Sequence, residues 1–167
     1  MNLTLVGMPA SGKSTVGVLL AKRLGYQFID SDLLIQEQEG RLLKEIIAQE
    51  GLEAFMKIEN QINCGIDADK AVIAPGGSVI YYEEAMNHFR EIGHVVYLKL
   101  SFEEFETRIG NPTDRGVVLK PGMTLRDLYE ERVPYYEKYA DIVIDETGKT
   151  PGDVVDELRE MAEQGKI

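Results

Sequence analysis

Short apolar segments alternate with longer helical segments along this chain, and this alternation limits the folds that it can adopt. Helical periodicity fills the intervals between apolar runs, with stop signals such as Gly25 after the first helix. Strands with nearly continuous apolar interiors, separated by helices, indicate a parallel sheet covered on both faces. The chain therefore predicts an α/β protein whose five-stranded parallel sheet has strands near residues 3–6, 26–29, 71–74, 94–98 and 142–144.

Length and composition set further limits. At 167 residues, with no linker-like stretch, the chain predicts a single domain over residues 1–167. The formal net charge of −11 argues against nucleic acid or anionic membrane partners, because a negative field repels polyanions. Cys64 is the single cysteine, and no basic region with a long apolar run opens the sequence. We expect a reduced, cytoplasmic protein, and we expect a monomer.

A glycine-rich motif lies between the first predicted strand and the first predicted helix. Residues 7–14 read Gly-Met-Pro-Ala-Ser-Gly-Lys-Ser and match the pattern G-x-x-x-x-G-K-[ST]. In this context, backbone N–H groups and the positive end of the helix face phosphate oxygens, while the serine hydroxyl suits Mg²⁺. The alternative is a strand–helix turn that holds no ligand. We expect nucleotide binding through Gly7, Ala10, Ser11, Gly12, Lys13, Ser14 and Thr15.

Two acids follow the second predicted strand directly, at Asp30 and Asp32. Ligands of open parallel sheets bind beyond the carboxyl ends of the strands, so both acids should lie on the rim that holds the glycine-rich motif. One acid can help to position the Mg²⁺ shell, and the other can accept or orient the proton of an attacking hydroxyl. An N-cap for the following helix is the structural alternative.

The segment 110–123 has no periodicity and is rich in glycine and proline. Its length and composition predict a mobile lid, because long irregular connections in compact domains are commonly functional. Arg115 lies in this segment and could bring positive charge to the phosphates. The alternative is an exposed loop arginine paired with Asp114.

The order of these motifs resembles the shikimate kinase family. The resemblance covers nearly the whole chain, from the phosphate motif and residues 28–32 through residues 51–59 and 76–77 to residues 132–136. It implies a three-layer P-loop kinase fold with a mobile lid near 110–123 and an acceptor-binding helical region near 32–66. It also implies ATP and Mg²⁺ as cofactors, and transfer of the γ-phosphoryl group to shikimate in aromatic amino acid biosynthesis.

The same resemblance implies roles for particular residues. Catalysis would fall to Lys13, Asp32 and Arg115, and the metal would contact Ser14 and Asp30. ATP would contact the residues of the phosphate motif together with Arg108 and Arg115. The acceptor would contact Asp32, Met56, Gly76, Gly77, Ser78 and Arg132.

The chain departs from the family pattern at three places. Met56 stands where a carboxylate-binding arginine is expected, and Lys57 is about 100° further around a helix. Ser78 replaces the third glycine of a triplet, and Gly116 follows Arg115 where the family has proline. Two alternatives therefore stay open: a kinase for a different small acceptor, such as a gluconate-like polyol acid, and a non-catalytic ATP-binding module.

Overall fold

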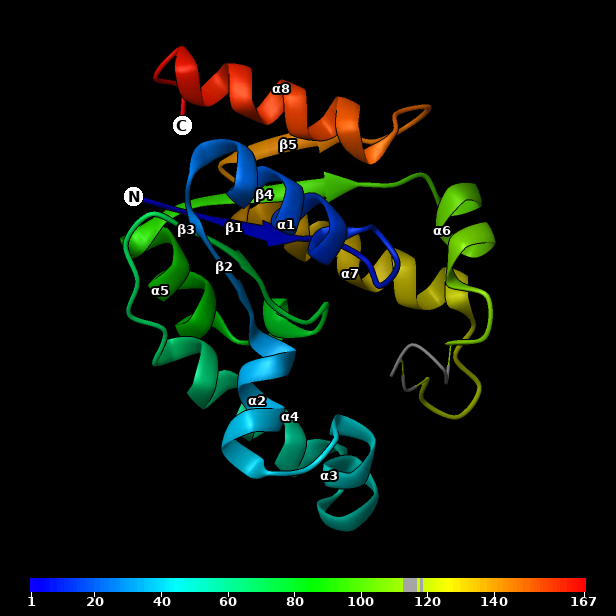
Figure 1. Cartoon of the computed structure of the whole chain (residues 1–167). Coiled ribbons are helices and arrows are strands. Elements are labelled where there is room, and N and C mark those ends of the chain that lie inside the picture. Colours follow the sequence, from blue (N-terminus) through cyan, green and yellow to red (C-terminus); the bar gives the residue numbers. More distant parts are fainter. Residues whose placement is uncertain (113–116, 118) are drawn as a thin grey trace.

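A computed structural model describes residues 1–112, 117 and 119–167 of the chain. Within these residues, five parallel strands form one sheet in the order β2-β3-β1-β4-β5 (Figure 1). The strands are β1 (Asn2–Val6), β2 (Gln27–Asp30), β3 (Ala71–Ala74), β4 (Gly93–Lys99) and β5 (Ile142–Asp145). The predicted five-stranded parallel α/β fold is confirmed, and each strand falls within two residues of its expected place.

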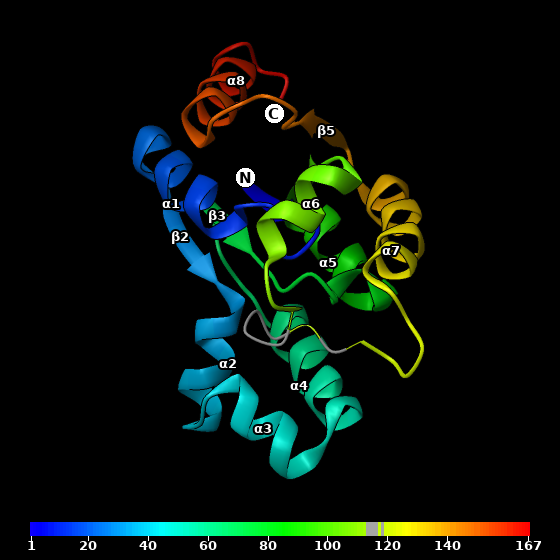
Figure 2. The same ribbon diagram turned by 90° about the vertical axis from the view of Figure 1, so that its right-hand side faces the viewer.

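Helices cover both faces of this sheet (Figure 2). The helices α1 (Lys13–Leu24) and α8 (Pro151–Glu163) lie on one face, and α5 (Glu83–Ile92), α6 (Phe102–Ile109) and α7 (Leu125–Tyr139) lie on the other. The sheet is therefore the middle of three layers. Among the described residues, no helix is both long and apolar enough to cross a membrane.

The period-2 geometry of a strand explains why the sheet builds two separate cores. In β4, Val96 and Leu98 pack with the cluster under α1 and α8, while Val95 and Tyr97 pack with the cluster under α5 and α7. All four side chains are buried, as expected for a strand covered on both faces. The unbroken apolar runs in the sequence reflect this double burial.

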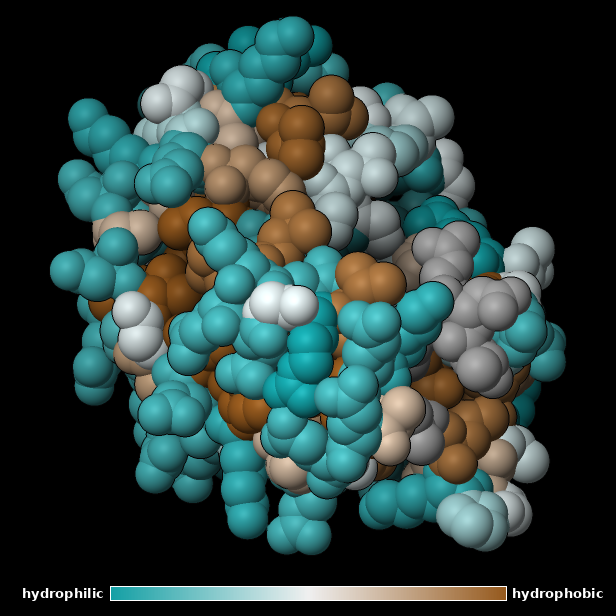
Figure 3. Space-filling model, turned by 60° about the horizontal axis from the view of Figure 1, so that its bottom comes forward, coloured by the Kyte–Doolittle hydropathy of each residue, from teal (hydrophilic) through white to brown (hydrophobic). Residues whose placement is uncertain are grey.

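A third group of helices extends from the carboxyl edge of the sheet. It contains α2 (Ser31–Glu39), α3 (Leu43–Glu50) and α4 (Leu52–Cys64), with breaks at the positive-φ residues Gly40 and Gly51. Its own small core comprises Ile35, Ile46, Phe55 and Ile62. Hydrophilic side chains cover most of this end of the molecule (Figure 3). A short 3-10 helix, η1 (Val79–Tyr81), was not predicted.

The buried Asn2 side chain holds three separate backbone segments together at the amino edge of the sheet. Its amide Nδ2 donates to the carbonyl oxygens of Ala68 (2.7 Å) and Ile92 (3.1 Å), and its Oδ1 accepts from the Ala71 N–H (2.9 Å). Backbone groups that lose such partners inside a protein carry a desolvation cost. This side chain therefore anchors the start of β1 to the segments before and after it in the sheet.

Asn2→Ala should lower the free energy of unfolding by about 2–4 kcal/mol, because it leaves three backbone groups without partners. Urea denaturation at pH 7 measures this loss. Asn60→Ala is a matched control, since the Asn60 amide donates an exposed hydrogen bond to Glu84 and accepts a weak one from the Cys64 thiol at 3.6 Å, and its loss should cost about 0.5 kcal/mol. Equal losses for the two variants would contradict the anchoring role.

Candidate active site

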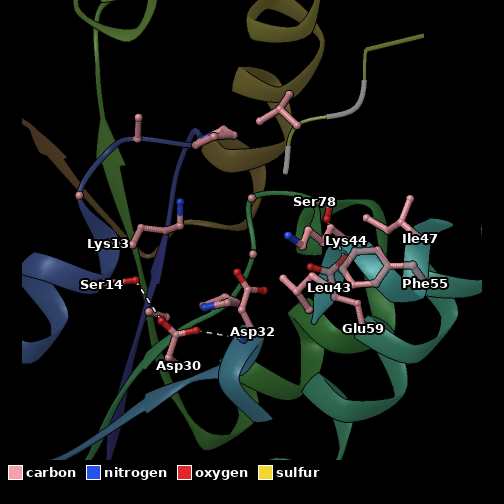
Figure 4. Close-up of a pocket in the computed structure, with 18 of the residues that line it drawn as sticks. Lys13, Ser14, Asp30, Asp32, Leu43, Lys44, Ile47, Phe55, Glu59 and Ser78 are labelled. Carbon is pink, nitrogen blue, oxygen red and sulfur yellow. Dashed lines mark hydrogen bonds between the residues drawn. The ribbon is translucent and has the colours of Figure 1, made fainter. Parts of the chain in front are cut away.

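A cavity of about 550 Å³ opens at the carboxyl edge of the sheet. Its walls come from the loop after β1, the start of α2, the helices α3 and α4, the turn after β3, and α7 (Figure 4). The volume is within the usual range for small-molecule sites. Residues from distant parts of the sequence therefore face one space at the edge where open parallel sheets bind ligands.

The loop after β1 has the shape of a phosphate cradle. Gly12 (φ 81°) and Ala10 (φ 65°) both have left-handed backbone conformations. At Gly7, an added Cβ would lie 2.7 Å from the Leu98 carbonyl oxygen, so the close approach of β1 and β4 excludes a side chain there. The loop leads straight into the N-terminus of α1, whose free N–H groups and dipole favour an anion.

Lys13, the first residue of α1, turns its side chain back over the loop. Its Nζ donates to the carbonyl oxygens of Gly7 and Met8, each at 3.0 Å. Burial lowers the pKa of this ammonium from its ordinary value to about 8. A triphosphate placed against the loop would supply the negative charge that this cation needs.

Ser14 and Asp30 form a pair suited to a magnesium ion. The Ser14 hydroxyl donates to Asp30 Oδ2 at 3.1 Å, while Asp30 Oδ1 caps α2 by accepting from the N–H groups of Asp32 and Leu33. The capping role and the metal role expected for Asp30 are therefore compatible, because they use different oxygens. Among the described residues, no group of three or more acidic, histidine or cysteine side chains is placed to hold a metal. Two oxygen ligands fit Mg²⁺, which keeps several waters and substrate phosphate oxygens.

Asp32 is the second residue of α2 and lines the cavity beside Lys13. Burial, and secondly the nearby charge of Asp30, raises its pKa to about 6, although Lys13 acts in the opposite direction. A carboxylate with a pKa near 6 is well matched to accept a proton at neutral pH.

Glu59 is a cavity residue to which sequence reasoning assigned no role. It is only 1% exposed, and its Oε2 accepts a hydrogen bond from the Ser78 hydroxyl at 2.7 Å. An added Cβ at Gly76 would lie 2.5 Å from Glu59 Oε1 and 3.4 Å from Asp32 Oδ1, so the turn after β3 is packed between two carboxylates. The available signal was a glutamate on the apolar face of α4, between the core residues Phe55 and Ile62.

Arg132 brings a cation from α7 to the opposite side of the cavity. It is 9% exposed, and its guanidinium carbon lies 5.5 Å from the centre of the Tyr81 ring. An added Cβ at Gly77 would approach its Nη1 to 3.0 Å. Among the described residues, no carboxylate lies within 4 Å of this guanidinium, and its Nε lacks a hydrogen-bond partner. A buried cation without an acidic partner favours an anionic ligand.

The structure brings most of the predicted site residues together around this cavity. Those that line it are Ala10, Gly12, Lys13, Ser14, Thr15, Asp30, Asp32, Gly76, Gly77, Ser78 and Arg132. Gly7 and Ser11 belong to the same loop but are buried behind it. Arg108 does not line the cavity and pairs with Glu104 on α6 at 3.6 Å. Met56 packs against the small core of α2, α3 and α4, because that apolar environment suits its side chain. Arg115 lies outside the described residues.

Burial raises the pKa of the Glu59 carboxyl from 4.5 to about 7. The free energy of unfolding should therefore fall as the pH rises. The folded protein keeps this proton while the unfolded chain loses it, so the stabilising effect is complete below pH 4.5 and is lost by about pH 7. Glu59→Gln should remove this dependence. Between pH 5 and pH 7.5, the free energy of unfolding should fall by on the order of 2 kcal/mol more in the wild type than in this variant.

Urea denaturation at the two pH values measures this difference. Glu106→Gln is the control, since Glu106 is exposed on α6 and the variant should retain the wild-type pH dependence. A Glu59→Gln variant that loses as much stability as the wild type would refute the burial of a protonated glutamate.

The glycine-rich loop follows the central strand of a parallel sheet, and it lines a small cavity together with an acid and an arginine. This combination defines the class of P-loop kinases that act on small molecules. The family model for shikimate kinase matches residues 9–163. The chain belongs to the shikimate kinase family.

Individual relatives agree with this assignment over almost their full lengths. A shikimate kinase from Sulfurihydrogenibium is 37% identical over 158 residues, covering 94% of this chain and 95% of the relative. One from Moorella thermoacetica is 38% identical over 163 residues, covering 95% and 92%. The solved shikimate kinase of Aquifex aeolicus superposes with a TM-score of 0.87 at 33% identity, covering 100% of this chain and 99% of that one. The Acinetobacter baumannii enzyme, solved in complex with shikimate, gives the same TM-score at 29% identity, covering 99% and 94%.

Proposed function

We infer that this protein is an ATP-dependent kinase that transfers the γ-phosphoryl group to a hydroxyl of shikimate, with Mg²⁺ as cofactor. The observation that carries this function is the meeting of the phosphate loop, Asp32 and Arg132 in one cavity of a chain of the shikimate kinase family. Another acceptor or a non-catalytic module has less support, since relatives named as shikimate kinases match nearly the whole chain. The activity would serve aromatic amino acid biosynthesis.

The nucleotide end of the cavity would hold the triphosphate. Backbone N–H groups of the loop and of the first turn of α1 would bind phosphate oxygens, and Lys13 would exchange its carbonyl partners for them. Ser14 and Asp30 would hold Mg²⁺, which when bound offsets negative charge on the phosphate oxygens. Positioning and charge compensation are the main demands of phosphoryl transfer.

The other end suits a cyclic carboxylate that carries hydroxyl groups. Asp32 would accept the proton of the attacking hydroxyl, and Glu59 would accept a hydrogen bond from another hydroxyl. Arg132 would bind the carboxylate, which answers its need for an acidic partner. Side chains of α3 and α4 would pack against the carbon ring: Leu43, Ile47 and Phe55.

Several finer features belong to the same proposal and rest on the family resemblance. Arg115, in a lid over residues 110–123, would bring positive charge to the transferred phosphoryl group, and Arg108 would lie near the adenine. Met56 would lie near the acceptor without supplying a charge. We further propose a single-domain, monomeric, cytoplasmic enzyme.

Asp32→Asn should reduce kcat for shikimate phosphorylation by about 10²–10⁴-fold, because the amide cannot accept the proton of the hydroxyl. The Kd for ATP should change by less than about threefold, since the phosphate loop stays intact. A coupled ADP assay and calorimetry with ATP and Mg²⁺ measure the two quantities.

Asp67→Asn, on an exposed loop outside the cavity, controls for the change of charge. Full turnover by Asp32→Asn would reject Asp32 as the proton acceptor. A wild-type enzyme that binds ATP tightly but phosphorylates neither shikimate nor any polyol or hydroxy acid in a panel would favour the non-catalytic module.

A further inference from the structure

Lys44 lines the cavity, but the proposed mechanism assigns no role to its side chain. It is the second residue of α3, and its side chain contributes to the cavity wall with Leu43 and Ile47. Figure 4 shows this wall on the side of the cavity away from Lys13. Among the described residues, the Lys44 ammonium makes no hydrogen bond or ion pair, and the residue is exposed to solvent.

Among the residues that the structure describes, none gives this positive charge a stabilising partner. A cation in the first turn of a helix faces the positive end of the helix dipole, which is unfavourable. The acid next to it, Glu45, uses its Oε2 to cap the helix by accepting from the Leu42 N–H at 2.8 Å. Lys44 therefore occupies a position where a neutral or acidic side chain would suit α3 better.

The carboxylates of the cavity already have partners of their own. Asp30 accepts from Ser14 and caps α2, and Glu59 accepts from Ser78. Asp32 is electrostatically coupled to Lys13 at the phosphate end. Two cations, Arg132 on α7 and Lys44 on α3, are thus left without an acidic partner among the described residues.

Because Met56 carries no charge, the positive charge of Lys44 matters more for binding an anionic acceptor. The Met56 side chain packs in the apolar core that it shares with Ile46 and Phe55, so α4 presents no charge to the acceptor from this position. Lys44 comes from the neighbouring helix, and a lysine has a long, flexible stem that can bring its ammonium to an anion inside the cavity. Leu43 and Ile47 would hold the ring of the acceptor while the charges hold its carboxylate.

We propose that Lys44 is a specificity-determining residue that binds the acceptor carboxylate together with Arg132. This proposal rests on the proposed function, because it takes the acceptor to be shikimate. An exposed ammonium contributes less than a buried, bidentate guanidinium, and its contribution is screened by salt. Lys44 therefore affects acceptor binding more than phosphoryl transfer, and it favours carboxylated acceptors over neutral ones.

Lys44→Ala should raise the KM for shikimate about 10-fold, which is the low end for a hydrogen bond to a charged group. The kcat and the KM for ATP should stay within about twofold of the wild type. Lys44→Arg should keep the KM within about threefold, because it retains the cation. The wild-type KM for shikimate should also rise with ionic strength more steeply than that of Lys44→Ala.

Lys57→Ala is the matched control. Lys57 is an exposed lysine of the adjacent helix α4, pairs with Glu53 at 3.9 Å and does not line the cavity, so its loss removes the same charge from nearby. Its KM for shikimate should remain that of the wild type. Thermal melting of each variant verifies that the protein is folded.

The carboxamide of shikimate tests which group Lys44 recognises. It is neutral where shikimate is anionic, so the Lys44→Ala effect on kcat/KM should shrink from about 10-fold to less than about twofold with it. An unchanged KM in Lys44→Ala, or an equal effect with the carboxamide, overturns the role of Lys44 while wild-type turnover still supports the proposed function. A wild type that neither binds nor phosphorylates shikimate overturns both.

Discussion

All five strands run in the same direction, so their carboxyl ends meet at one edge of the sheet, and the whole candidate site depends on this constraint. With β1 in the middle of the order, the phosphate loop that follows it lies between the ends of its neighbours. Asp30 arrives at the end of β2, and the turn containing Gly76 follows β3. The residues proposed for phosphate binding, metal binding and proton transfer therefore lie together at one edge of the sheet.

The fold buries several ionisable side chains of the cavity and gives them only some of the oppositely charged partners that they need. Burial lowers the pKa of Lys13 and raises those of Asp32 and Glu59, so each is held closer to its neutral form than in water. Arg132 is equally withdrawn from solvent without a carboxylate beside it in the described structure. Such an arrangement costs stability in the free protein, and ligands with complementary charges recover that cost when they bind.

Local patterns carried much of the fold and part of the site. Apolar runs identified the strands, and the glycine-rich motif and the acids after the second strand identified the phosphate end, because both are contiguous in the sequence. Lys44 could not be identified in this way, since only tertiary packing brings α3 to the cavity. Glu59 had only the weaker signal of a glutamate on the apolar face of α4. The packing of Met56 in a small apolar core likewise became visible only in three dimensions.

Ala10 has a consequence for the energetics of nucleotide binding. Its left-handed φ of 65° is unfavourable for a residue with a Cβ, by roughly 1 kcal/mol, so the loop has a shape that this residue does not itself prefer. The turn from the Ser11 N–H to the Met8 carbonyl, at 3.1 Å, helps to maintain that shape. The conformational cost of this loop is therefore part of the free energy of folding. The loop does not have to change shape when a triphosphate binds, so this cost does not weaken the binding.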